Sequence, residues 1–239
     1  MTLCRLALAG AFVAVAPAFA LAAAQPITVP TGQIIKACAK IPSPLRSAVV
    51  CTKNIEVRGG APRSGYAFEV KEGTTLPSGI KLTAAGIVTA SKKNNPPLPT
   101  RISNPINFTV SDGTRSKNGK VMLEMDKSSS CSCPDLTAGF GALPDARGGQ
   151  PYGIALPVSG PPSNETHVPA YSWRIVRGSL PPAVFGLPPG MVLDRTTGVL
   201  RGTPKADTSG HDFYFHVRIT EENTNSTADS AGPFSLHVD

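Results

Sequence analysis

The chain has 239 residues, of which 24 are Pro and 23 are Gly, and 41% of its residues are hydrophobic. So many Pro and Gly residues predict frequent turns and few long helices, which favours an all-β fold. Only 16% of the residues are charged, which excludes a highly charged disordered chain, and the hydrophobic fraction is enough for a buried core.

Residues 1–24 have the composition of a secretory signal peptide. Arg5 precedes an apolar run, and small residues ending at Ala20 or Ala24 offer cleavage sites. The run is short for a membrane span, and the sequence contains no second one. We therefore expect a mature chain without a transmembrane segment that is secreted, periplasmic or held at the cell surface.

Four cysteines remain after the expected cleavage: Cys38, Cys51, Cys131 and Cys133. An even number in an exported chain predicts two disulfides, which four cysteines can form in three ways. Residues two apart in a strand lie too far apart to be bridged, so we expect Cys131 and Cys133 each to pair with Cys38 or Cys51. A zinc site is the alternative, although the spacing fits no common zinc finger.

The formal net charge of +7 is unevenly distributed. Residues 25–126 hold 14 Lys and Arg against 6 Asp and Glu, whereas residues 127–239 hold 8 against 10. A basic excess of this kind is either a solvated surface or a contact area for an anionic surface or polymer.

The two halves of the chain repeat one another. Tyr66–Val70 matches Tyr171–Ile175, and Leu76–Leu82 matches Leu187–Leu193, with six more residues in the second copy that we interpret as a surface-loop insertion. Each copy ends in two strands with period-two alternation, which is typical of an antiparallel sandwich. The sequence thus predicts a divergent sandwich domain over 25–126, a Cys-containing linker over 127–148 and a second sandwich domain over 149–239.

The second copy contains Trp173 and, in order after it, the separated motifs between Leu187 and Pro204. In these motifs it resembles the immunoglobulin-like family of bacterial surface and secreted proteins, which is related to dystroglycan-type cadherin-like domains. The first copy resembles a divergent member, because Thr89-Ala90-Ser91 stands where Gly-Thr-Pro is expected. The resemblance implies two tandem scaffold or adhesion modules without catalytic residues of their own. It is carried by separated motifs that include Trp173, Leu187, Pro188, Gly190, Gly198, Gly202 and Pro204.

Some relatives in this family bind calcium near strand ends and domain junctions. The matching positions here are Asp112 and Glu221, and Asp194 is a further acidic candidate. Calcium requires six to eight oxygen ligands, and the sequence has no Asp-x-Asp or Asp-x-Asn-Asp-Asn cluster. We therefore expect no cofactor, with calcium as the alternative, and interpret Asp112 and Glu221 as solvated acids at strand ends.

Candidate catalytic motifs are few. Ser78 and Lys81 fit a Ser-x-x-Lys pattern, but flanking Pro and Gly place the serine in a turn, and the four histidines are scattered. We expect surface positions for His167, His211, His216 and His237.

Aromatic residues raise the question of a sugar platform. Alternation with Ile175 predicts that Trp173 is a core residue, whereas Tyr152, Tyr171 and Tyr214 could form an exposed strip.

Together these patterns predict a non-enzymatic binding, adhesion or spacer module of the cell envelope or extracellular space. The alternative is an accessory module that binds carbohydrate or an anionic polymer. The partner would be a protein or an envelope polymer.

Overall fold

The computed structural model describes residues 24–40, 47–77, 79–90, 103–126, 131–163, 169–179 and 185–239. The expected signal segment up to residue 23, Ser78, His167 and residues 180–184 of the expected insertion lie outside them. In the described part the only helical element is a short 3-10 turn, η1 (Ala206–Thr208). No helix there is long and apolar enough to cross a membrane.

The first half of the chain forms strands at each position where the sequence alternates. Two further strands cover the stretch that carries the first two cysteines. The strands are β1 (Ile34–Lys40), β2 (Ser47–Lys53), β3 (Ala67–Val70), β4 (Ile80–Leu82), β5 (Val88–Ala90), β6 (Ser103–Ser111) and β7 (Ser116–Asp126).

The second half contributes ten strands, several of them short because Pro and Gly interrupt the chain. These are β8 (Thr137–Ala138), β9 (Gly141–Ala142), β10 (Tyr152–Ala155), β11 (Val158–Ser163), β12 (Tyr171–Val176), β13 (Met191–Leu193), β14 (Val199–Gly202), β15 (His211–Glu221), β16 (Ser226–Asp229) and β17 (Phe234–Val238).

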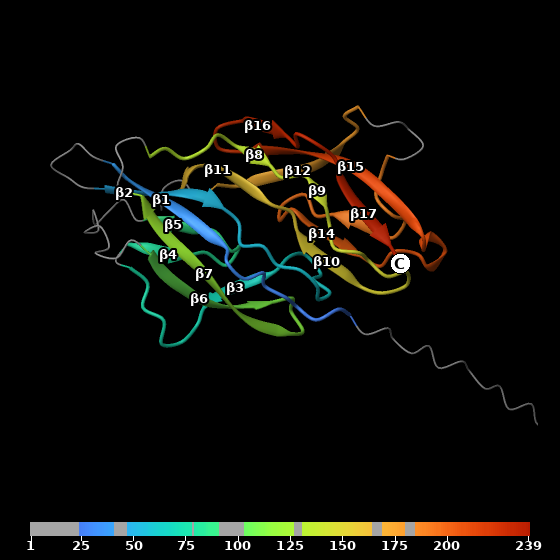
Figure 1. The fold of residues 1–239 in the computed structure, drawn as a ribbon, viewed down its shortest axis with the longest axis horizontal. Helices are drawn as coiled ribbons and strands as arrows, with labels where there is room; N and C mark the ends of the chain where they lie inside the picture. Colours follow the sequence, from blue (N-terminus) through green and yellow to red (C-terminus); the bar gives the residue numbers. More distant parts are fainter. Residues whose placement is uncertain are drawn as a thin grey trace, which may run out of the picture.

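Four sheets are formed, and the largest crosses from one repeat into the other (Figure 1). Its strand order is β3-β6-β7-β1-β2-β11-β8, so its last two strands come from the second half of the sequence. The other sheets have the orders β10-β14-β13, β12-β15-β17-β9 and β4-β5, and β16 pairs with β15. The fold is all-β and immunoglobulin-like, as the sequence predicts.

Alternating residues of the long hairpins form two separate cores. In the first, Ile106, Phe108 and Val110 of β6 are fully buried. In the second, Phe215 and Val217 of β15 are fully buried against strands β10, β13 and β14. Burial of alternate side chains on facing sheets is what defines a β-sandwich.

An antiparallel ladder with one register shift joins the two repeats along a seam. It begins with β2 paired to β11, from Val50 opposite Ser163 to Lys53 opposite Ser159. Asn54 then bridges the strands, since its side-chain amide donates to the Leu156 carbonyl at 2.8 Å and its side-chain oxygen accepts from the Val158 N–H at 2.9 Å. The ladder resumes beyond Asn54, so the repeats lie side by side rather than end to end (Figure 1).

Each repeat also places an apolar side chain in the core of the other. Ile87 of the first repeat packs in the second core, and Val199, at the matching position of the second repeat, packs in the first core. This exchange makes the seam a shared apolar interface. We propose that the two repeats are tandem domains. The matching placement of Ile87 and Val199, each in the core of the other repeat, supports this division.

Of residues 127–148, expected as a linker, the described residues 131–148 contribute one strand to the seven-stranded sheet and one to the sheet that contains β17. Strand β8 pairs with β11 and strand β9 pairs with β17. The disulfides tether the preceding Cys131 and Cys133 to the first repeat. The described part of this segment is therefore held at both ends.

Candidate binding site

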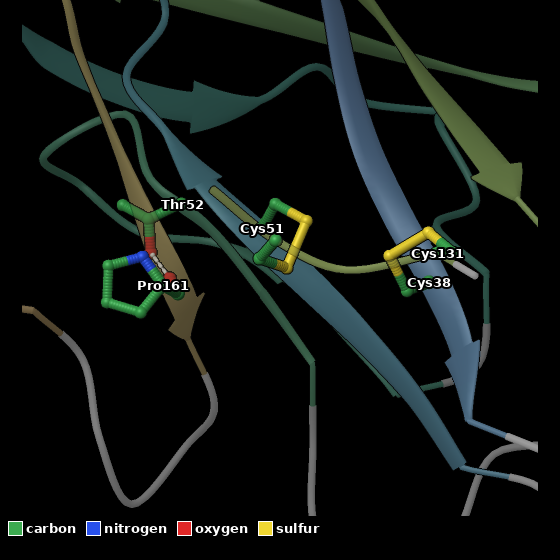
Figure 2. Close-up of a disulfide and its surroundings, with 6 residues drawn as sticks. Cys38, Cys51, Thr52, Cys131 and Pro161 are labelled. Atoms are coloured by element: carbon green, nitrogen blue, oxygen red, sulfur yellow. Dashed lines mark hydrogen bonds between the residues drawn. A yellow bond between two sulfur atoms is a disulfide. The ribbon is translucent and has the colours of Figure 1, made fainter. Parts of the chain in front are cut away.

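Two neighbouring disulfides fasten the segment after β7 to the first repeat (Figure 2). Cys38 of β1 is bonded to Cys131, and Cys51 of β2 is bonded to Cys133. This confirms the pairing of Cys131 and Cys133 with the two earlier cysteines. The adjacent Thr52 hydroxyl donates to the Pro161 carbonyl at 2.7 Å, so the covalent links lie directly beside the seam (Figure 2).

The sulfurs are close enough for a metal site in geometry alone. Ligand atoms of Cys38, Cys51 and Cys133 lie within 4.8 Å of one another, and within the described ranges no other three His, Cys, Asp or Glu side chains do so. All four sulfurs are bonded in pairs, however, and a disulfide offers no thiolate to zinc. We therefore assign them a structural role.

Asp112, expected as a solvated acid, is instead buried, with 4% of its surface exposed. One carboxylate oxygen accepts the N–H groups of Thr114 and Arg115, both at 2.8 Å, and the other accepts the Ala61 N–H at 2.9 Å. Burial alone would raise the pKa of Asp112, but these backbone hydrogen bonds outweigh it and lower the pKa to about 2. The side chain thus holds the β6–β7 turn.

The other two calcium candidates also hold turns. Glu221, which is fully buried, accepts the Thr224 N–H at 3.1 Å, and Asp194 accepts the N–H groups of Thr196 and Thr197 at 3.1 and 3.0 Å. The expectation that Glu221 is solvated was wrong, because the turn after β15 folds over it. These carboxylates lie in different turns and face protein donors, so calcium does not enter our proposed function.

Replacing Asp112 by asparagine should lower the free energy of unfolding by about 2 kcal/mol at pH 7. The folded-state pKa lies below the unfolded value of about 3.9, so the contribution is present above that pH and is lost as the pH falls towards 2. Urea unfolding of both proteins from pH 7 to pH 2 checks this. A stability gap that stays constant over the range would contradict the assignment.

The three histidines in the described part of the chain do not converge on a site. His211 and His237 lie at the surface or near it, but His216 is buried, although the alternation places it on the polar face of β15. Its Nδ1 lies 3.2 Å from the Ser230 hydroxyl, and the turn at Gly178 packs over its ring. The expectation of a surface position was wrong for His216 because loops cover that face.

The tyrosines do not form an exposed strip. Tyr152 and Tyr171 are 3% and 7% exposed, and only Tyr214 is half-buried. Burial raises the pKa of the Tyr171 hydroxyl to about 12. Trp173 is a core residue, as predicted, with 2% of its surface exposed. A coplanar sugar platform of these three rings is therefore excluded.

A groove lined by lysines lies on the first repeat. Lys71, in the loop after β3, and Lys117 and Lys120, on β7, line a volume of about 810 Å³. Glu72 is the one acid among the lining residues, and the three lysines are exposed. Side chains of Asn107 and Asn118 and the loop Val29–Gln33 add hydrogen-bonding groups along its wall. The groove, which we call the lysine groove, is therefore suited to an anionic ligand with many hydroxyls.

Comparisons with known proteins find a family model that matches the second half of the chain. No curated protein has a similar sequence. Among solved structures, Drosophila N-cadherin EC1-4 is 10% identical over 90% of this chain and 51% of its own, with a TM-score of 0.32. An endo-fucoidan hydrolase from glycoside hydrolase family 107 is 19% identical over 72% of this chain and 23% of its own, with a TM-score of 0.29.

These likenesses are too distant to carry any inference about activity, and the chain spans about half or less of each of those structures. The family comparison is specific. Residues 141–238 match the model described as "Putative Ig domain". They contain Trp173 and the motifs from Leu187 to Pro204, which are the elements that carry the resemblance in the sequence. Residues 141–238 are therefore similar to this immunoglobulin-like family.

Proposed function

We propose that this chain is an exported, non-enzymatic binding module whose first repeat holds an acidic polysaccharide. Immunoglobulin-like domains are commonly adhesion or binding modules, and disulfides are typical of proteins outside the cytosol. The observation that carries the proposal is the lysine groove, whose lining includes three exposed lysines and only one acidic residue. The rest of the chain acts as a rigid support for this surface.

Charge and hydrogen bonding together favour a polysaccharide over a small anion. Lys71, Asn107 and Lys120, which line the groove, come from the loop after β3, from β6 and from β7. Exposed lysines give modest, salt-dependent attraction, whereas amide side chains can bond hydroxyl groups. A polymer that repeats both kinds of group would use the whole groove.

Reversing the three groove charges should weaken binding to an acidic polysaccharide about 10-fold. The variant is Lys71→Glu, Lys117→Glu and Lys120→Glu, and dissociation constants for polygalacturonate would be measured by titration at several salt concentrations. Wild-type affinity should fall as salt rises, because exposed charges are screened.

The control changes the same net charge on the second repeat, with Arg177→Glu, Arg195→Glu and Lys205→Glu. These three side chains are exposed and lie outside the groove. Equal losses in both variants would mean that only net charge matters and would refute the groove. Hydrolysis of the polymer with turnover would refute the non-enzymatic role.

A further inference from the structure

A second cavity lies on the seam. It shares no lining residue with the lysine groove. Its volume is about 460 Å³, within the range of small-molecule sites. Both repeats line it with residues from matching positions. The pairs are Tyr66 with Tyr171, Phe68 with Trp173, and Ile87 with Val199.

The interior of this seam cavity is apolar, and a hydrogen bond between the two repeats connects its rim. Ile55, Ala155 and Val158 line it and are buried. Across the rim, the Thr197 hydroxyl of the second repeat donates to the Ser64 carbonyl of the first at 2.8 Å. The cavity is thus held open between two connected walls, which favours a preformed site for an apolar group.

Glu222 is the one charged side chain among the lining residues. It is exposed, and its backbone N–H donates to the Ala170 carbonyl at 2.8 Å, which fixes its position at the rim. No Lys, Arg or His of the described chain lies within ion-pair distance of its carboxylate, although the chain as a whole has a net charge of +7. An unpaired carboxylate beside an apolar cavity favours a cationic group and disfavours an anionic one.

In the described part of the rim, two strand N–H groups that a peptide could use are already bonded within the chain. The Phe68 N–H donates to the Ala84 carbonyl at 3.0 Å, and the Trp173 N–H donates to the Arg195 carbonyl at 2.7 Å. Peptide addition to a sheet requires such main-chain groups to be free. A compact small molecule therefore fits the cavity better than an extended chain.

We propose that the seam cavity binds a small amphiphile with an apolar body and one cationic group. The apolar body fills the space between the paired aromatic walls, and the cation lies beside Glu222 at the rim. This site is independent of the acidic polysaccharide assigned to the lysine groove, so either can fail without the other.

The single tryptophan of the chain, Trp173, lines the cavity and reports its occupancy through fluorescence. Three probes share one apolar body: 1-adamantylmethylamine, 1-adamantanemethanol and 1-adamantanecarboxylate. Each should change the Trp173 emission on binding, with affinity falling in the order amine, alcohol, carboxylate. No change with any probe at millimolar concentration would overturn the proposal.

Two variants test the charge and the volume separately. Glu222→Gln should weaken amine binding about 3- to 5-fold and leave alcohol binding unchanged, whereas Asp207→Asn, an exposed acid outside the cavity, should change neither. Ala85→Phe should block all three probes, and Ala231→Phe should not. Equal amine binding by wild type and Glu222→Gln, or unchanged binding by a folded Ala85→Phe variant, would overturn the proposal. Retention on polygalacturonate should be the same in all four variants.

Discussion

In a chain that already lacks the Cys51–Cys133 bond, replacing Cys38 and Cys131 together by alanine should lower the free energy of unfolding by about 4 to 5 kcal/mol. The two residues are 93 positions apart, so the bond closes a long loop in the unfolded chain and removes much of its conformational entropy. Alanine is chosen because Cys38 is buried, and a serine hydroxyl there would add a desolvation cost. Denaturant unfolding without reductant measures the effect.

The second disulfide provides the internal control. Cys51 and Cys133 are 82 positions apart and close a loop that overlaps the first almost completely. With the Cys51–Cys133 bond intact, replacing Cys38 and Cys131 should therefore cost clearly less, because the remaining bond still restricts most of the same loop in the unfolded chain. If removing the Cys38–Cys131 bond from the chain that lacks Cys51–Cys133 lowers the free energy of unfolding by less than about 1 kcal/mol, this bond does not stabilise the fold through loop closure.

The strands and the cysteine pairing could be predicted because both depend on local patterns. Alternation in β6 and β15 marks which side chains are buried, and residues two apart such as Cys131 and Cys133 must seek partners elsewhere. These signals survive in any sandwich with one polar face per sheet. They fix the elements without fixing how the two repeats meet.

The seam could not be predicted, because its residues do not look like paired strands. Gly160, Pro161 and Pro162 lie in β11, where the register shifts, and Asn54 completes the ladder through its side chain. Proline and glycine normally argue against a paired strand. The pairing depends on partners about 100 residues away, and a single sequence carries no direct signal for such contacts.

Polar residues on outward positions were interpreted wrongly for one physical reason. His216 and Glu221 occupy β15, and Asp112 follows β6, but turns fold over all three and supply hydrogen-bond partners. A period-two pattern reports the direction of a side chain and not what covers it. The lysine groove was missed similarly, since only the register of β6 with β7 and the loop after β3 brings Lys71 near Lys120.

Replacing Gly198 by alanine should lower the free energy of unfolding by about 3 to 4 kcal/mol. Gly198 has φ +68°, and a Cβ there would lie 2.3 Å from Cε2 of the buried Trp173 ring. The first repeat makes the same contact, since a Cβ on Gly86 would lie 2.6 Å from Cε2 of Phe68. Both turn glycines thus cover the central aromatic ring of their repeat.

The expected loss has two causes, which are backbone strain at positive φ and the clash of the new Cβ with an aromatic ring. Gly210 separates them. It has φ +78°, but no atom lies within 4 Å of a Cβ built on it, so Gly210→Ala should cost only the backbone strain of about 1 kcal/mol. Thermal and urea unfolding of Gly198→Ala, Gly86→Ala and Gly210→Ala compare them directly. Equal losses in all three would show that the rings can move aside. Larger losses at Gly198 and Gly86 would show that each core depends on the close approach of its turn to one aromatic ring, which is the feature that the two repeats share most closely.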